Sequence, residues 1–517
     1  MKTIKRSIAF VLAMILTLAM SVTVFAEGEG AKNTFTITVN EAKAGHTYEA
    51  YQILKGDLSK SQTTLSNIEW GTGIQADKQK DLDPSENARH YAEETLSKLT
   101  SSDKIDKLKA EAQKIASALS NTVAGSVSVT QDNAKTEITG LEPGYYLIKD
   151  KDGSLTVDEE NKEAKAYTEY ILNIVADTTI TPKTDVPSVV KKVKDTNDTT
   201  GDTTEWQDSA DYDIGDDVPF QLTATLANNI ESYKTYSLKF NDTLSKGLDY
   251  NNDAVIKLGD QDVTKSFTPS YDATAKTLTF TCDNILAFGA KNSDKIVVEY
   301  TAKLNENAEI GGKVGNPNTV YLEFSNNPNN GGEGDRGETP EDKVIVFTYK
   351  LKVKKVEKVG DEYKPLTGAE FSLFKKVKVD GKDELELVEV KEILSTNPEG
   401  TVFEFTGLDD GTYVLRETKT PDGYNSIEDK TFTISAKHDE NSDDPKLTEL
   451  TGNPASGSVI DFGVIMPEKG ELPTDVVNNK GSVLPSTGGA GRVAIYVIGA
   501  ILVLGGGIVL VTKKRVR

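Results

Sequence analysis

The chain has 517 residues, 37% of them hydrophobic and 27% charged, and its formal net charge is -22. This length is too great for one hydrophobic core and predicts roughly three domains, and the balance of apolar and charged residues suits soluble globular domains rather than disorder. The negative charge excludes a nucleic-acid partner, because its phosphates would be repelled.

Cysteine and histidine are too sparse for a disulfide framework or for a spaced metal motif. Cys282 is the single cysteine, so no intramolecular disulfide forms. His46, His90 and His438 are scattered, neither C-x-x-C nor H-E-x-x-H occurs, and no acid-rich loop has EF-hand spacing. We therefore expect no metal and no cofactor.

Residues 1–26 are typical of a secretory signal peptide. Lys2, Lys5 and Arg6 precede an apolar run from Ile8, and the stretch Val24–Ala26 provides a signal-peptidase site. We expect cleavage after Ala26 and export of the chain.

Residues 27–183 are predicted to form an N-terminal β domain with a helical insertion. Alternating apolar residues predict an opening strand at Phe35, Ile37 and Val39 and a closing strand at Tyr170, Leu172 and Ile174. In the insertion, Asp83 is the expected N-cap of a helix, followed by Pro84 and a capping-box Glu86. A further helix is predicted from apolar residues spaced by three and four, which we expect to pack in the core. They are Ile105, Leu108, Ala112, Ile115 and Leu119.

Residues 184–347 and 348–483 are predicted to form two more domains, a middle and a C-terminal one. Short alternating strands, such as 278–280 and 296–300, are separated by Gly, Asn and Asp turns, a pattern typical of β-sandwiches. The expected fold class is mainly β, with tandem immunoglobulin-like or collagen-adhesin-type sandwiches. A G-x-G-x-x-G at Gly332, Gly334 and Gly337 lacks the strand-turn-helix context of a dinucleotide site and is interpreted as a loop.

One internal repeat links the first and third domains. Thr139–Asp150 aligns without gaps with Thr406–Glu417. The two domains are therefore predicted to share a fold, with Asp150 in the place of Glu417.

Two lysines are predicted on inward strand positions. Alternation puts Lys191 on the same side as Val189 and Val193, and Lys355 on the same side as Leu351 and Val353. A lone buried ammonium costs several kcal/mol, so such a lysine usually loses its proton or finds a partner. Taken singly, each lysine is more often a tilted surface residue.

The same alternation supplies candidate partners for both lysines. Asn318 and Asn478 are predicted inward near the ends of the second and third segments, and Asp242 and Glu417 are candidate inward acids. Each of these two segments thus offers one lysine, one asparagine and one acid.

The C-terminus carries an ordered set of three features. Leu484, Pro485, Ser486, Thr487 and Gly488 precede a 20-residue apolar run, 493–512, which is followed by a basic tail. This set resembles the cell-wall sorting signal of Gram-positive surface proteins, which implies that a sortase cuts between Thr487 and Gly488 and passes the Thr487 carbonyl to an amine. The alternative is a simple membrane anchor, because about 20 apolar residues span a hydrocarbon core.

The chain as a whole resembles the backbone pilins of Gram-positive bacteria, whose domains carry self-formed Lys-Asn isopeptide bonds. The third segment is similar to their collagen-adhesin B-type domain. The residues that carry this similarity are Lys355–Glu357, Pro365–Phe371, Tyr413–Glu417, Pro421–Tyr424 and Asn478.

The resemblance implies two isopeptide bonds: Lys191 with Asn318, assisted by Asp242, and Lys355 with Asn478, assisted by Glu417. Burial favours both reactive forms, since it lowers the pKa of an amine and raises that of a carboxyl group. The reaction occurs once per molecule, so the protein is not an enzyme in the turnover sense. The opening strand of the first domain has no lysine, and we expect no bond there.

The resemblance also implies polymerisation through an acceptor lysine at the end of the first domain. Lys183 lies where the family has Tyr-Pro-Lys-Asn, although Thr181 and Thr184 replace the tyrosine and the asparagine. Lys191, Lys192 and Lys194 are alternatives. The implied partners are a pilus-specific sortase and a housekeeping sortase, other copies of the chain, ancillary pilins and peptidoglycan, at the cell surface.

Two other classes of function are alternatives. A monomeric wall-anchored adhesin or an ancillary pilin would need a binding surface rich in aromatic residues, and aromatic residues make up only 7% of the chain. A wall-bound enzyme would need a nucleophile, a base and an orienting group. No such trio is evident, and carboxylate pairs such as Asp216 and Asp217 are interpreted as solvated turns.

Overall fold

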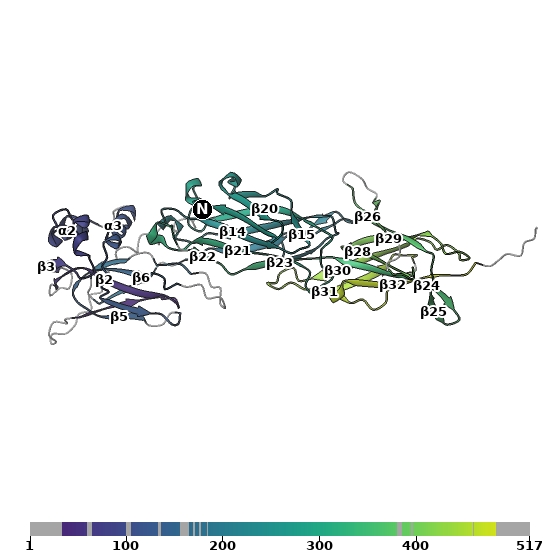
Figure 1. The fold of residues 1–517 in the computed structure, drawn as a ribbon, viewed down its shortest axis with the longest axis horizontal. Coiled ribbons are helices and arrows are strands. Elements are labelled where there is room, and N and C mark those ends of the chain that lie inside the picture. The colour runs from purple at the N-terminus through teal and green to yellow at the C-terminus, as the bar shows by residue number, and fades with distance from the viewer. Residues whose placement is uncertain are drawn as a thin grey trace, which may run out of the picture.

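The strands of the chain form pairs of facing sheets that follow one another in a row, with the first pair carrying helices at one end of the molecule (Figure 1). This computed structural model describes residues 34–58, 65–99, 105–132, 136–155, 165–168, 171–174, 177–182, 185–334, 336–379, 385–393, 397–458 and 460–481. Within these residues the architecture is mainly β, as predicted.

The middle pair of sheets is built from strands in which every second side chain is buried. Strands β9 (Ser188–Val193), β13 (Asp217–Thr225) and β20 (Lys295–Leu304) show this alternation and are neighbours in one sheet. That sheet is completed by β15 (Leu248–Tyr250), β16 (Val255–Leu258) and β17 (Gln261–Asp262). The facing sheet contains β12 (Ser209–Asp211), β23 (Asp342–Phe347), β21 (Asn316–Ser325), β14 (Leu238–Leu244), β19 (Thr277–Cys282), β18 (Thr268–Asp272) and β22 (Arg336–Glu338). Apolar side chains from both sheets form one continuous core.

The third pair of sheets brings the first and last strands of its domain side by side. Strand β24 (Tyr349–Val359) pairs antiparallel with β25 (Glu362–Pro365) and β28 (Val402–Leu408), and parallel with the last strand, β32 (Glu471–Asn478). The facing sheet contains β27 (Glu386–Ile393), β26 (Glu370–Val377), β29 (Gly411–Lys419), β30 (Lys430–His438) and β31 (Leu447–Pro454).

The first pair of sheets repeats the pairing of the third. Strand β1 (Phe35–Val39) pairs antiparallel with β5 (Thr136–Leu141) and parallel with β8 (Thr178–Ile180), as β24 does with β28 and β32. The facing sheet contains β2 (Thr47–Leu58), β3 (Leu65–Trp70), β4 (Gly125–Ser128), β6 (Gly144–Asp150) and β7 (Ile171–Ile174). The common fold predicted from the sequence repeat is confirmed.

The helical insertion is present, but its first predicted cap is wrong. A short helix α1 (Gln79–Leu82) ends at Asp83, and α2 (Ala88–Glu94) begins four residues later than expected, capped by Asn87, which accepts a hydrogen bond from the His90 amide at 3.1 Å. Glu86 has a positive φ of 54°, which helical backbone does not allow. The Asp83 carboxylate instead accepts from the Asn87 amide at 3.0 Å and closes a turn. Helix α3 (Ile105–Ser117) lies where it was predicted, with Ala112 and Ile115 buried.

The glycine-rich motif lies in a loop and at a sheet edge. It follows the short 3-10 helix η6 (Pro328–Asn330), and Gly337 belongs to β22. Gly332 has a φ of 92°, and a Cβ atom there would lie 1.7 Å from the carbonyl oxygen of Thr235. Close packing against the backbone of Thr235 therefore requires a glycine at position 332. The prediction that the motif forms a loop is confirmed as far as Gly334.

Candidate crosslinking sites

Lys191 lies inside the middle sandwich. Its side chain is 0% exposed, and Val189 and Val193 on the same strand are also buried, which confirms the predicted inward face of β9. The chain folds this way because β9 is hydrogen-bonded to β13 with Lys191 opposite Leu222, so both side chains point into the core.

The Lys191 ammonium meets its predicted acid across the two sheets. Nζ lies 2.6 Å from Asp242 Oδ2 on β14 and 3.1 Å from the hydroxyl of Tyr300 on β20. Asn318 on β21 is also fully buried, and its Nδ2 donates to the same hydroxyl at 2.8 Å. Tyr300 therefore bridges the lysine, the acid and the asparagine.

Two buried oxygen atoms of this site have no hydrogen-bond partner. They are Oδ1 of Asp242 and Oδ1 of Asn318. Tyr300 donates its only hydroxyl proton to Asp242 Oδ2 at 2.8 Å. A proton on the Asp242 carboxyl group would turn its unpaired oxygen from an acceptor into a donor.

Electrostatics favour that neutral state. Burial lowers the pKa of Lys191, although the charge of Asp242 opposes the shift. Burial likewise raises the pKa of Asp242, and the lysine opposes this shift too. The pair is thus biased towards a free amine beside a protonated acid, the two forms that amide exchange requires.

Lys355 occupies the corresponding position in the third domain. It is 0% exposed, and its Nζ donates to Oδ1 of Asn478 and lies 2.8 Å from Oε1 of Glu417. Lys355 and Asn478 come from the parallel neighbours β24 and β32, where Glu357 lies opposite Asn478, whereas Glu417 reaches them from β29 in the facing sheet.

Glu417 contacts both Lys355 and Asn478. Its two oxygens accept from Asn478 Nδ2 at 3.0 and 3.1 Å, and Thr420 donates to it at 3.0 Å. Burial lowers the pKa of Lys355, against the influence of Glu417. The amine also lies 5.4 Å from the centre of the Phe371 ring, which closes the site on its apolar side.

The equivalent position in the first domain holds a different pair. Asp150 accepts from the Thr168 amide at 2.6 Å and lies 2.9 Å from His46 Nδ1, and both side chains are buried. Strand β1 places Phe35, Ile37 and Val39 inward and carries no lysine. The prediction that this domain forms no bond stays a prediction.

The sequence analysis missed Tyr300, which contacts every member of the Lys191 site. The signal was present, because Ile296, Val298 and Tyr300 alternate along β20 and all three are buried. A hydroxyl on an otherwise apolar inward face needs a polar partner. That requirement points to a polar site in the same core.

The residues predicted to join subunits lie outside the described residues. These are Lys183 and the sorting motif Leu484–Gly488, and the predicted apolar run 493–512 lies outside them too. In the part of the chain that is described, no helix is long and apolar enough to cross a membrane. Among the alternative acceptors, Lys191 is buried and Lys192 forms an ion pair with Asp208.

Three domain families match parts of the chain. Residues 214–328 match the Gram-positive pilin backbone subunit 2, Cna-B-like domain. Residues 350–447 match the SpaA prealbumin-like fold domain, and residues 476–516 match the LPXTG cell wall anchor motif.

Similar proteins come from Streptococcus pyogenes and Corynebacterium diphtheriae. The chain is 25% identical over 395 residues to the trypsin-resistant surface T6 protein of Streptococcus pyogenes serotype M6, covering 64% of this chain and 70% of the relative. The solved structure of the T6 backbone pilin of that serotype superposes with a TM-score of 0.54 at 17% identity, covering 88% of this chain and all of the other, which supports the fold. The full-length major pilin SpaD from Corynebacterium diphtheriae gives a TM-score of 0.49 at 17% identity, covering 87% of this chain and 99% of the other.

Proposed function

Because the chain is a cell-wall-anchored Gram-positive backbone pilin, we propose that sortase assembles it into a fibre shaft and that two internal amide bonds strengthen this shaft. Sortase would join the Thr487 carbonyl of one subunit to the Lys183 amine of the next. The proposed domains are residues 27–183, 184–347 and 348–483, with a bond in each of the last two.

The observation that carries the internal bonds is the contact set of Lys355. A fully buried amine contacts the carboxamide of Asn478, and one acid, Glu417, lies within hydrogen-bonding distance of both. An ion pair with Glu417 alone would not require an asparagine at the same point. Burial of an ion pair without further bonding is rarely a gain in stability, so the arrangement favours chemistry.

The reaction conserves atoms without a cofactor. The neutral Lys355 amine attacks Cγ of Asn478 and forms a new C–N bond, while Glu417 lies at the leaving nitrogen, with its oxygens 3.0 and 3.1 Å from Asn478 Nδ2. The acid group then relays a proton from the attacking nitrogen to the leaving nitrogen, the original C–N bond breaks, and ammonia departs. Glu417 ends in its starting protonation state. Asp242 has the same role for Lys191 and Asn318.

Tandem mass spectrometry of the purified mature chain tests these bonds. The intact mass should be short by two ammonia molecules, and digestion should yield branched peptides that join Lys191 to Asn318 and Lys355 to Asn478. Substituting Asn318→Ala should leave a deficit of only one ammonia relative to the variant's own calculated mass and abolish only the first branched peptide. An unshifted intact mass in the parent protein excludes both bonds.

The intersubunit joint has its own test. We expect Lys183→Ala, expressed with the pilus sortase, to lose the high-mass ladder in denaturing gels, while Lys194→Ala retains it. Lys194 is a matched control because it is a partly exposed neighbour whose ammonium lies 5.0 Å from the Trp206 ring centre. A ladder that persists in Lys183→Ala rejects this acceptor and leaves the internal bonds untouched.

A further inference from the structure

The carboxamide of Asn478 is held in one orientation at the end of β32. Its Nδ2 lies 3.0 and 3.1 Å from the two oxygens of Glu417 and also donates to the main-chain carbonyl of Asn425 at 3.1 Å. A carbonyl oxygen can only accept, so the amide nitrogen must occupy this side of the group. The amide oxygen then faces Lys355, which donates to it. The leaving nitrogen is thus turned towards the acid and the carbonyl towards the amine.

The segment that follows β29 is fastened to the end of the last strand by main-chain hydrogen bonds. The Asn425 amide donates to the Asn479 carbonyl at 3.0 Å, and the Gly481 amide donates to the Gly423 carbonyl at 3.0 Å. These bonds keep the carbonyl of Asn425 beside the reacting carboxamide. They involve no side chain, so a side-chain substitution in this segment leaves them in place.

Glu417 reaches the carboxamide from an irregular point of β29. Phe371 pairs with Glu417, but the next pair joins Glu370 to Lys419, so Thr418 is an extra residue opposite β26. Such a bulge redirects the side chains next to it and is frequent beside reactive sites. Because the ladder is interrupted here, the direction of the Glu417 carboxyl group depends on side-chain contacts.

Thr420 supplies one of these contacts. Its hydroxyl donates to Oε2 of Glu417 at 3.0 Å, while Oε1 of the same carboxyl group lies 2.8 Å from Lys355 Nζ. The two contacts act on different oxygens, so together they keep the plane of the carboxyl group against the amide nitrogen of Asn478. A hydroxyl has no charge, so it holds the acid without fixing it in the ionised form.

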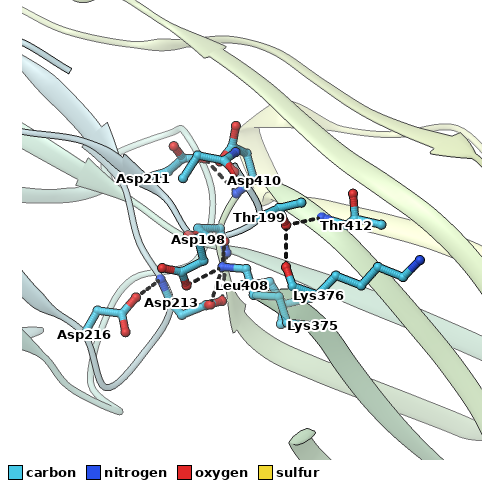
Figure 2. Close-up of polar contacts among 12 residues, drawn as sticks. Asp198, Thr199, Asp211, Asp213, Asp216, Lys375, Lys376, Leu408, Asp410 and Thr412 are labelled. Atoms are coloured by element: carbon cyan, nitrogen blue, oxygen red, sulfur yellow. Dashed lines mark hydrogen bonds and ion pairs between the residues drawn. The ribbon is translucent and has the colours of Figure 1, made fainter. Parts of the chain in front are cut away.

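Another buried lysine of the third domain shows what several carboxylates do to an amine. Lys375 is 3% exposed and lies 2.9 Å from Asp198 and 2.6 Å from Asp213 of the middle domain (Figure 2). Burial opposes the charge of Lys375, but the carboxylates outweigh burial and raise its pKa, so this amine stays protonated and cannot attack a carbonyl group. Asp216 belongs to the same acidic group, so its interpretation as a solvated turn residue is wrong, whereas Asp217 is exposed.

The Lys355 site differs from this acidic group in both respects. Its acid, Glu417, is held by the neutral hydroxyl of Thr420, and burial lowers the pKa of the Lys355 amine. A supporting hydroxyl therefore suits a site in which an amine has to lose its proton and an acid has to carry one.

The corresponding acids of the other two domains follow the same rule. In the middle domain the Tyr300 hydroxyl donates to Asp242 at 2.8 Å, so the predicted acid again accepts from a neutral hydroxyl. In the first domain, where we expect no bond, Asp150 accepts from the Thr168 main-chain amide at 2.6 Å and faces His46. A hydroxyl on the acid thus accompanies both of the predicted bonds.

We propose that Thr420 is a positioning residue for the amide bond of the third domain. Its hydroxyl holds the Glu417 carboxyl group against the leaving nitrogen of Asn478, so that the proton released by the attacking amine reaches that nitrogen and ammonia departs. Thr420 itself forms and breaks no covalent bond and acts only through Glu417. This role rests on the proposed bond between Lys355 and Asn478, and it determines how fast that bond forms.

Timed cell-free synthesis of the full mature chain tests this role. Samples are quenched in denaturant at intervals and digested, and mass spectrometry measures the branched peptide that joins Lys355 to Asn478. Thr420→Val keeps the size of the side chain but removes the hydroxyl. It should slow formation of this peptide by about 10- to 100-fold, because a displacement of about 1 Å in a reacting group can cost that much. Thr420→Ser restores the hydroxyl and should restore most of the parental rate.

Two controls separate positioning from folding. The branched peptide that joins Lys191 to Asn318 is measured in the same samples and should form at the parental rate in every variant, because it belongs to the middle domain. Thr418→Val is the matched side-chain control, since Thr418 is exposed on the same strand. It should form both branched peptides at the parental rate.

Failure of the proposed bond and failure of the positioning role give different results. A parent chain without the peptide that joins Lys355 to Asn478 overturns the bond, and the role of Thr420 with it. A linked parent together with a Thr420→Val variant that links at the parental rate overturns the positioning role alone. A Thr420→Ser variant as slow as Thr420→Val also overturns it, as does an equal delay of both branched peptides, because the hydroxyl would then not be acting on Glu417.

Discussion

Replacing Glu417 by glutamine should prevent the bond in the third domain while leaving its shape intact. The amide side chain cannot cycle a proton, so Lys355 and Asn478 should remain separate. Lys355 and Asn478 are 123 positions apart. By the chain-entropy relation used for disulfides, a crosslink closing a loop of this length is worth about 5 kcal/mol. For a domain of this size the melting temperature of the third domain should fall by about 15 to 20 °C.

Calorimetry and intact mass, measured on the same sample, test this prediction by reporting the loss of the bond and the change in stability together. Relative to the mass calculated from its own sequence, Glu417→Gln should be short by one ammonia where the parent is short by two, and only the transition of the third domain should shift. Glu370→Gln is the matched control, because Glu370 lies on the adjacent strand in an exposed pair with Lys419, 2.9 Å away. It should change stability by less than about 1 kcal/mol. The reasoning would be refuted if Glu417→Gln were still short by two ammonia molecules. It would also be refuted if the variant were short by only one while the thermal transition of the third domain did not move.

Three other predictions follow from the described contacts. Tyr300→Phe removes the hydroxyl that bridges the Lys191 site, so formation of the Lys191–Asn318 bond should slow by about 10- to 100-fold. Mass spectra of freshly folded protein should then show an unlinked fraction, and linkage at the parental rate would contradict this role. Burial and the charge of Asp213 raise the pKa of Asp216 to about 6, so the folded state takes up the proton more readily and stability falls as pH rises from about 4 to 6. Asp216→Asn should therefore gain about 1 to 2 kcal/mol over the parent at pH 7 and nothing at pH 4, and equal gains in melts at both pH values would contradict the assignment. Limited proteolysis should cut residues 27–183 first, because we expect no internal bond there; cleavage of the other domains while this one stays whole would count against it.

The inward residues were predictable because strands repeat with period two. Alternation placed Lys191 and Lys355 on inward strand positions, together with Asn318 and Asn478, and all four are buried. Their mutual contacts depend on which strands pair and in which register, and this was not in the local pattern. The family resemblance supplied the pairing that alternation could not.

Other features could not be predicted from local signals. Asp83 has the spacing of a helix cap, but the left-handed backbone of Glu86 turns the same residues into a tight turn. Asp195 and Asp211 of the middle domain meet His438 of the third only when the two domains dock. Sequence spacing carries no information about such a meeting.

The parallel pairing of β24 with β32 has a mechanical consequence. In the proposed fibre, tension enters each subunit at Lys183 and leaves at Thr487, so pulling acts on the middle and third domains in series. A bond between Lys355 and Asn478 diverts that force from β24 directly into β32, and the residues between them stay slack. The first domain precedes Lys183, so in the proposed fibre it lies outside the segment that carries the tension. It therefore needs no internal bond to resist pulling, and its opening strand has no lysine to form one.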